Sequence, residues 1–160
     1  MCLRVYYQNS KGIILIDSGW DEAYADNLAD SMKKLGLNPK EIKYTLVTHG
    51  HSDHYGGSQF IKDKYSPDAK IAMNLVDKRF LSVMPHETKF GFTRPKVDMG
   101  LEDGQLIKLG DTTVQILLTP GHTPGSVSMI VPVTDNGTLR KNAEDVIARL
   151  PKPVPRNKER

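Results

Sequence analysis

Two histidine-bearing loops constrain the fold of this chain more than any other feature of its sequence. The first reads HGHSDHYGG at residues 49–57 and follows the strand-like run KYTLVT at 43–48. The second reads TPGHTPG at 119–125 and also follows directly on a predicted strand. Four of the five histidines lie in these loops, so any fold has to account for their clustering.

The residue types and spacing in these loops are those of a metal site, since imidazole and carboxylate are the usual ligands of catalytic zinc. In an extended loop, the i, i+2 spacing places His49 and His51 on the same side, where both can grip one ion. Asp53 and His54 follow where the chain turns into a helix, so they point at a neighbouring position. His122 lies in a rigid turn that can bring a third imidazole to the first ion. A lone histidine is usually a core or surface residue, but packing does not require a cluster of this kind.

Glycines flank the predicted ligands. We expect Gly50, Gly56 and Gly57 to let the backbone turn tightly around the ions. Asp17 ends a predicted strand beside the first loop, and two roles are open to it. It either caps the turn or holds a metal-bound imidazole in one tautomer.

Apolar patterning predicts strands and helices throughout residues 3–133. The run at 12–17 is continuously apolar, which suits a strand covered on both faces. Helical spacing of apolar residues predicts a helix over 22–35. The other predicted strands are 3–8, 43–48, 70–73, 105–109, 112–119 and 126–133, the other helices are 57–65 and 74–82, and 83–96 is a long loop.

The C-terminal part carries conflicting signals. Asp135-Asn136-Gly137 is a strong hairpin signal, yet the residues after it do not alternate as a return strand would. We instead predict a helix over 138–150 with Asn142 as its cap. Prolines follow, and the remaining residues are predicted to be disordered.

Composition excludes several classes of protein. A chain of 160 residues suits one domain with its own core. The single cysteine, Cys2, excludes an internal disulfide framework. No apolar run approaches the ~18–20 residues of a membrane span, so no membrane partner is expected. The N-terminus lacks a signal-peptide core, which predicts a cytoplasmic location as written, and a periplasmic or secreted one if the true N-terminus is missing.

The basic excess is confined to the end of the chain. Residues 1–139 carry 15 basic and 16 acidic side chains, whereas residues 140–160 carry 7 basic and 3 acidic ones. That segment has no aromatic residue for base stacking, so a solvated basic tail is expected rather than a nucleic-acid interface. The expected partner is a small-molecule substrate, and the oligomeric state is left open.

The segment THGHSDHYGG resembles the His-x-His-x-Asp-His signature of the metallo-β-lactamase superfamily. Ile-Leu-Ile-Asp-Ser-Gly before it and Thr-Pro-Gly-His-Thr-Pro-Gly-Ser after it match the flanking motifs in the expected order. The chain looks most like the β-lactamase subclass that has aspartate-histidine here and no zinc-binding cysteine. Thioesterases of the glyoxalase II type usually place a Gly-Asp pair after the strand that reads SVSMIVPV, and this chain has none.

The resemblance implies an α/β fold, the four-layer αββα sandwich made of two similar halves. The first half is expected to be complete and the second incomplete, so the chain would be a C-terminally truncated or partial member. Residues 1–137 would form a partial metallo-β-lactamase-like domain. Residues 138–160 would form an atypical basic C-terminal helix and a disordered tail.

The resemblance also implies two zinc sites, with His49, His51 and His122 as ligands of the first and Asp53 and His54 as ligands of the second. The family's second site uses one more histidine near the C-terminal end of the fold. No histidine follows His122, and His86 is the only other one. One or two zinc ions are therefore expected here.

The chemistry implied by the family is hydrolysis by a zinc-bound hydroxide, which attacks the carbonyl of a β-lactam or a similar cyclic amide or ester. Asp53 would be the catalytic residue that orients the nucleophile. Two alternatives stay open. One is a thioester or lactone hydrolase of the same superfamily, and the other is a truncated, non-catalytic remnant that binds zinc.

Overall fold

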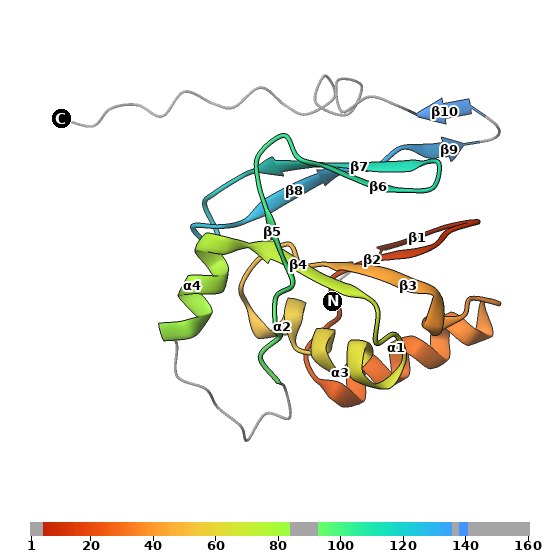
Figure 1. Ribbon diagram of the computed structural model, residues 1–160, viewed down its shortest axis with the longest axis horizontal. Coiled ribbons are helices and arrows are strands. Elements are labelled where there is room, and N and C mark those ends of the chain that lie inside the picture. Colours follow the sequence, from red (N-terminus) through yellow and green to blue (C-terminus); the bar gives the residue numbers. More distant parts are fainter. Residues whose placement is uncertain (1–4, 84–92, 136–137, 141–160) are drawn as a thin grey trace.

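The computed structural model describes residues 5–83, 93–135 and 138–140. A five-stranded sheet in the order β1-β2-β3-β4-β5 lies at its centre (Figure 1). The strands are β1 (Val5–Asn9), β2 (Gly12–Ile16), β3 (Ile42–Leu46), β4 (Lys70–Asn74) and β5 (Met99–Leu101). β1 runs antiparallel to β2, and β2 to β5 are parallel. β2 is covered on both faces, as its continuous apolar run predicts, and Ile13, Ile14 and Leu15 are fully buried.

Two helices cover one face of this sheet (Figure 1). α1 (Glu22–Lys34) begins where the Asp21 carboxylate accepts a hydrogen bond from the Tyr24 amide at 2.7 Å. α3 (Ser58–Lys64) lies beside α1, and the short 3-10 helix η1 (Pro39–Glu41) leads into β3. The apolar core between helices and sheet consists of Ile13, Leu15, Ala25, Leu28, Met32, Leu37, Ile42, Ile61 and Ala69.

A second, antiparallel sheet packs against the opposite face (Figure 1). Its strands are β6 (Leu106–Leu109), β7 (Thr112–Leu118) and β8 (Val127–Ile130). The core between the two sheets consists of Ile14, Leu46, Ala72, Leu101, Ile107, Val114, Ile116 and Val127. Ile14 faces this core while its neighbours Ile13 and Leu15 face the helices, because successive strand side chains point to opposite faces. The fold is α/β, and the described residues form three layers of the expected αββα sandwich, in the order helix, sheet, sheet.

The C-terminal hairpin corrects one prediction. β9 (Val133–Asp135) and β10 (Thr138–Arg140) pair antiparallel, so the hairpin signal is confirmed. The helix predicted over 138–150 is therefore wrong at its first three residues, because a two-residue turn brings its flanks into register without any apolar alternation. From residue 141 onward, the predicted helix and tail lie outside the described residues.

Two further strands differ from the prediction. The strand predicted at 126–133 is divided into β8 and β9 at Pro132, which has no amide to donate to a neighbouring strand. β5 was not predicted, because a three-residue edge strand containing Gly100 is too short to show a pattern. Its pairing with β4 places it in the sheet.

The remaining helices agree with the predicted positions. α2 (Ser52–Tyr55) is the helix expected to begin near Asp53, and α4 (Leu75–Val83) matches the one predicted at 74–82. Among the helices of the described residues, none has the length and apolar character to cross a membrane. Cys2 and His86 lie outside the described residues.

Asp98 ties α3 and β4 to the segment that precedes β5. Its carboxylate accepts hydrogen bonds from Lys62 Nζ at 2.7 Å and from the Ile71 amide at 2.8 Å. Burial by itself raises the pKa of Asp98, but the bonds from Lys62 and Ile71 outweigh it and lower the pKa below its ordinary value. Such a carboxylate stabilises the fold above its ordinary pKa, and that stability is lost as the pH falls through the folded pKa.

We therefore expect Asp98→Asn to lower the free energy of unfolding by about 1 kcal/mol at neutral pH. The difference from the natural protein should shrink as the pH falls below the ordinary carboxyl pKa of 3.8. Urea denaturation at neutral and acidic pH measures both effects. Asp68→Asn changes an exposed carboxylate and serves as the control. Identical pH dependence in the natural protein and Asp98→Asn would contradict the prediction.

Candidate metal centre

The two histidine loops meet because they follow strands of sheets that pack together. The first loop follows β3, which ends at Leu46, and the second follows β7, which ends at Leu118. The amide of Val127, at the start of β8, donates to the carbonyl of Thr48 at 2.9 Å. That bond joins the first loop directly to the second sheet, so segments far apart in the sequence become neighbours.

Three imidazoles converge at this junction. The metal-binding atoms of His49, His51 and His122 all lie within 4.8 Å of one another. Nδ1 of His51 is 3.1 Å from Nε2 of His122. The ring centroid of His49 is 4.9 Å from that of His51 and 4.7 Å from that of His122. The structure thus brings together the three residues predicted for the first zinc.

Nε2 of His49 tests whether a metal ion fits these residues. It is buried and has no hydrogen-bond partner among the described residues, and such a nitrogen costs free energy unless something satisfies it. Burial, and then the neighbouring imidazoles of His54 and His51, lower the pKa of His49 to about 4. Its ring is therefore neutral at pH ~7, the form that coordinates metals. The three imidazoles fit a metal ion.

Asp53 and His54 lie on α2 beside this cluster. The ring centroid of His54 is 3.9 Å from that of His49. Nε2 of His54 is 3.5 Å from a carboxylate oxygen of Asp53. The pair presents one nitrogen and one oxygen next to the first site, which is the neighbouring position that the sequence predicts for them.

Asp17 performs both roles that the sequence leaves open. Its carboxylate accepts hydrogen bonds from Nδ1 of His54 and from the amide of Thr48, each at 2.8 Å. The bond to Asp17 raises the pKa of His54 and places a ring proton on Nδ1, so Nε2 faces Asp53. Asp17 has a φ of 58°, an uncommon conformation for a residue other than glycine. The bonds at its carboxylate hold it there.

Thr48 and Asp77 are site residues that sequence reasoning missed. The hydroxyl of Thr48 donates to Asp17 at 2.9 Å and lies 3.1 Å from Nδ1 of His49 and 3.2 Å from Nδ1 of His54. Its position directly before His49 is the one signal that points to it. Asp77, on α4, contacts the backbone of both loops. The sequence holds no signal for Asp77, because backbone amides have no residue-specific pattern.

Gly56 and Gly57 serve a purpose different from the predicted tight turn. Both have φ angles that any residue adopts, −58° and −91°. A Cβ on Gly56 would lie 1.9 Å from the carbonyl oxygen of Trp20, and one on Gly57 would lie 2.5 Å from Cβ of Ala25. Glycine is needed here for space, because the backbone after α2 packs directly against Trp20 and α1.

Comparison with known proteins places this geometry in a family. The model of the metallo-beta-lactamase superfamily matches residues 3–135, which include all five predicted ligands. The chain belongs to the metallo-beta-lactamase superfamily.

Solved members of the superfamily share its fold. BJP-1, a subclass B3 metallo-beta-lactamase of Bradyrhizobium japonicum, is 32% identical with a TM-score of 0.75, over 84% of this chain and 52% of that one. FEZ-1 metallo-beta-lactamase from Legionella gormanii is 32% identical with a TM-score of 0.72, over 84% of this chain and 53% of that one.

Curated relatives in the superfamily have other names. Hydroxyacylglutathione hydrolase GloC of Haemophilus influenzae is 31% identical over 131 residues, which are 78% of this chain and 58% of that protein. Glyoxylase B2 of Dictyostelium discoideum is 33% identical over 111 residues, which are 67% of this chain and 37% of that protein. This superfamily member thus spans 37–58% of the length of the relatives it matches.

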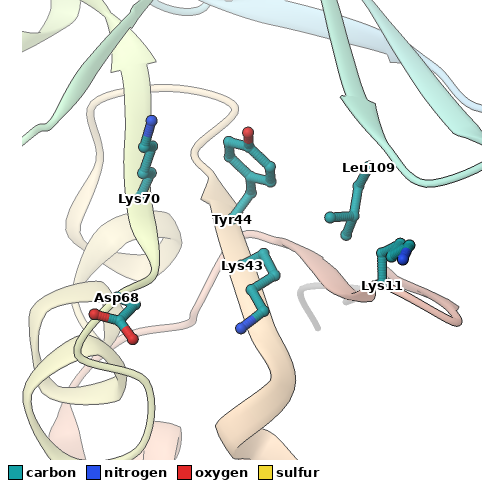
Figure 2. A pocket seen from close by; sticks show the side chains of 6 residues that line it. All are labelled: Lys11, Lys43, Tyr44, Asp68, Lys70 and Leu109. Carbon is teal, nitrogen blue, oxygen red and sulfur yellow. The ribbon is translucent and has the colours of Figure 1, made fainter.

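A cleft of about 310 Å³ lies at the other end of the central sheet (Figure 2). Its lining consists of Lys11, Lys43, Tyr44, Asp68, Lys70 and Leu109. Lys43 and Lys70 lie at the amino ends of β3 and β4, whereas the first histidine loop follows the carboxyl end of β3. Ligands of open parallel sheets bind beyond the carboxyl ends of the strands, so the histidine end is the candidate active site of this metallo-beta-lactamase superfamily member.

Proposed function

We propose that this chain carries the first metal site of a zinc-dependent hydrolase that acts on a β-lactam or a similar cyclic amide or ester. The observation that carries the proposal is the convergence of three imidazoles, with the buried Nε2 of His49 lacking a hydrogen-bond partner among the described residues. Zinc, when bound, lowers the pKa of a coordinated water to about 7 and polarises a substrate carbonyl. Membership of the superfamily supports hydrolysis as the class of reaction.

The chain's own residues divide into two groups in this proposal. His49, His51 and His122 would hold the first zinc, and Asp53 and His54 would contribute to a second. Asp53 is proposed as the catalytic residue. Its side chain is 36% exposed, so a carboxylate oxygen can reach an attacking water, orient it and accept its proton. Asp17 keeps His54 oriented through Nδ1, which leaves Nε2 beside Asp53.

Two substrate classes have separate support. The similar solved structures are metallo-beta-lactamases, and the chain shares with their subclass an aspartate-histidine pair and no zinc-binding cysteine. This favours a β-lactam. The similar curated proteins include a hydroxyacylglutathione hydrolase, which favours a thioester. Attack on the carbonyl carbon is common to both, and the leaving atom is nitrogen in one and sulfur in the other.

We expect the purified protein to bind zinc and to hydrolyse nitrocefin, and to lose both properties after dialysis against EDTA. Activity should return when zinc is added, because the ligand residues themselves are unchanged. Elemental mass spectrometry measures the bound metal, and absorbance measures hydrolysis. A stoichiometry of roughly two ions per chain would support the second site as well.

The same assay separates the alternatives. Turnover of S-lactoylglutathione without turnover of nitrocefin would favour the thioester hydrolase. Zinc binding without turnover of either substrate would contradict the hydrolase proposal and favour a non-catalytic zinc-binding protein. A folded protein that binds no zinc would overturn the metal centre itself.

A further inference from the structure

A buried carboxylate connects the two histidine loops. Asp77 lies in the first turn of α4 and is 0% exposed. One oxygen, Oδ2, accepts hydrogen bonds from the amide of Gly50 at 2.7 Å and from the hydroxyl of Thr123 at 2.6 Å. The other oxygen, Oδ1, accepts a hydrogen bond from the amide of Gly125 at 2.7 Å. Each oxygen therefore serves a different part of the junction between the loops.

All three donors flank predicted metal ligands. Gly50 lies between His49 and His51, and Thr123 directly follows His122. The two loops belong to different sheets, and a metal site needs its ligands held to within about 0.5 Å. Hydrogen bonds to an ionised carboxylate are shorter and roughly twice as strong as those between neutral groups. Asp77 thus fixes the backbone on both sides of the cluster from one rigid helix.

The two glycines make this close approach possible. A Cβ on Gly125 would lie 2.7 Å from Oδ1 and from the amide nitrogen of Asp77. A Cβ on Gly50 would lie 3.3 Å from Oδ2. Their lack of side chains lets the loops approach the carboxylate directly, which indicates that the loops and the carboxylate form one unit.

We propose that Asp77 is a positioning residue that sets the spacing of His49 and His51 relative to His122 before metal binds. The proposal rests on the proposed function in one respect, since it takes these histidines as the zinc ligands. Asp77 touches neither metal nor substrate in this role. It acts through the backbone amides of Gly50 and Gly125 and through the hydroxyl of Thr123.

Asp77→Asn tests the proposal with almost no change of shape. An amide has only one oxygen, so an N–H group would face a donor either on the Gly50 and Thr123 side or on the Gly125 side. We expect the zinc affinity, measured by competition with a chromophoric chelator, to fall by roughly ten-fold or more. Hydrogen exchange of the Gly50 or Gly125 amide in the metal-free protein should accelerate as well.

A matched pair at Thr123 keeps the test valid if Asp77→Asn does not fold. Thr123→Val removes the donor to Asp77 and should lower the zinc affinity, whereas Thr123→Ser retains a hydroxyl and should preserve it. Ile61→Val, in the core beside the helices, should lower the melting temperature with unchanged zinc affinity. These variants separate positioning from a general loss of stability.

The outcomes distinguish this inference from the proposed function. If the natural protein binds zinc and Asp77→Asn and Thr123→Val bind it equally well, the positioning role is overturned and the metal centre stands. If the natural protein binds no zinc, both fail together. A lower zinc affinity in Asp77→Asn or Thr123→Val, with affinity preserved in Thr123→Ser and Ile61→Val, supports the proposal.

Discussion

Replacing His122 with alanine is expected to lower the zinc affinity by more than about 100-fold, because loss of a ligand exceeds the 10–100-fold effect of losing an outer hydrogen bond. The His122 side chain is exposed, so the free energy of unfolding of the metal-free protein should change by less than about 0.5 kcal/mol. Hydrolysis of nitrocefin should fall to the background rate. Chelator competition and urea denaturation measure the two properties independently.

The matched control is His86→Ala, which removes the one histidine outside the two loops. We expect this variant to retain the affinity of the first zinc site. Equal loss of zinc in both variants would show that the effect does not come from the three-histidine cluster. Unchanged zinc affinity in His122→Ala would contradict the assignment of this residue as a ligand.

Gly56→Ala is expected to destabilise the fold by at least about 3 kcal/mol, at the upper end of overpacking effects. The added Cβ would lie 1.9 Å from the carbonyl oxygen of Trp20 and 2.6 Å from that of Ser52, and both are backbone atoms that cannot rotate away. The clash would separate α2, which carries Asp53 and His54, from the segment after β2. Equilibrium denaturation in urea measures the loss.

Gly121→Ala makes the same chemical change in open space, since nothing lies within 4 Å of a Cβ at that position. Its effect on the free energy of unfolding should stay within about 0.5 kcal/mol. Comparable stability of the two alanine variants would refute the close-packing explanation for Gly56. It would then return attention to the turn that the sequence alone predicts.

The sequence anticipated those features of the site that depend on neighbouring residues. The i, i+2 spacing of His49 and His51 and the start of a helix near Asp53 are local properties, and both are present in the structure. The strand at 12–17 was recognisable because burial on both faces requires a continuous apolar run. The Asp-Asn-Gly turn was likewise local, but its return strand was missed because three residues carry too little pattern.

What the sequence by itself determined is which residue types can bind metal, where the strands that deliver them lie, and to which family such an order of motifs belongs. Tertiary structure alone decided that His122 meets the first loop, that Asp77 connects the two loops, and that Gly56 has no room for a side chain. The physical reason is the range of the interactions. Spacing along one strand or turn follows from backbone geometry, whereas contacts between loops of two sheets exist only once the apolar cores have packed those sheets together.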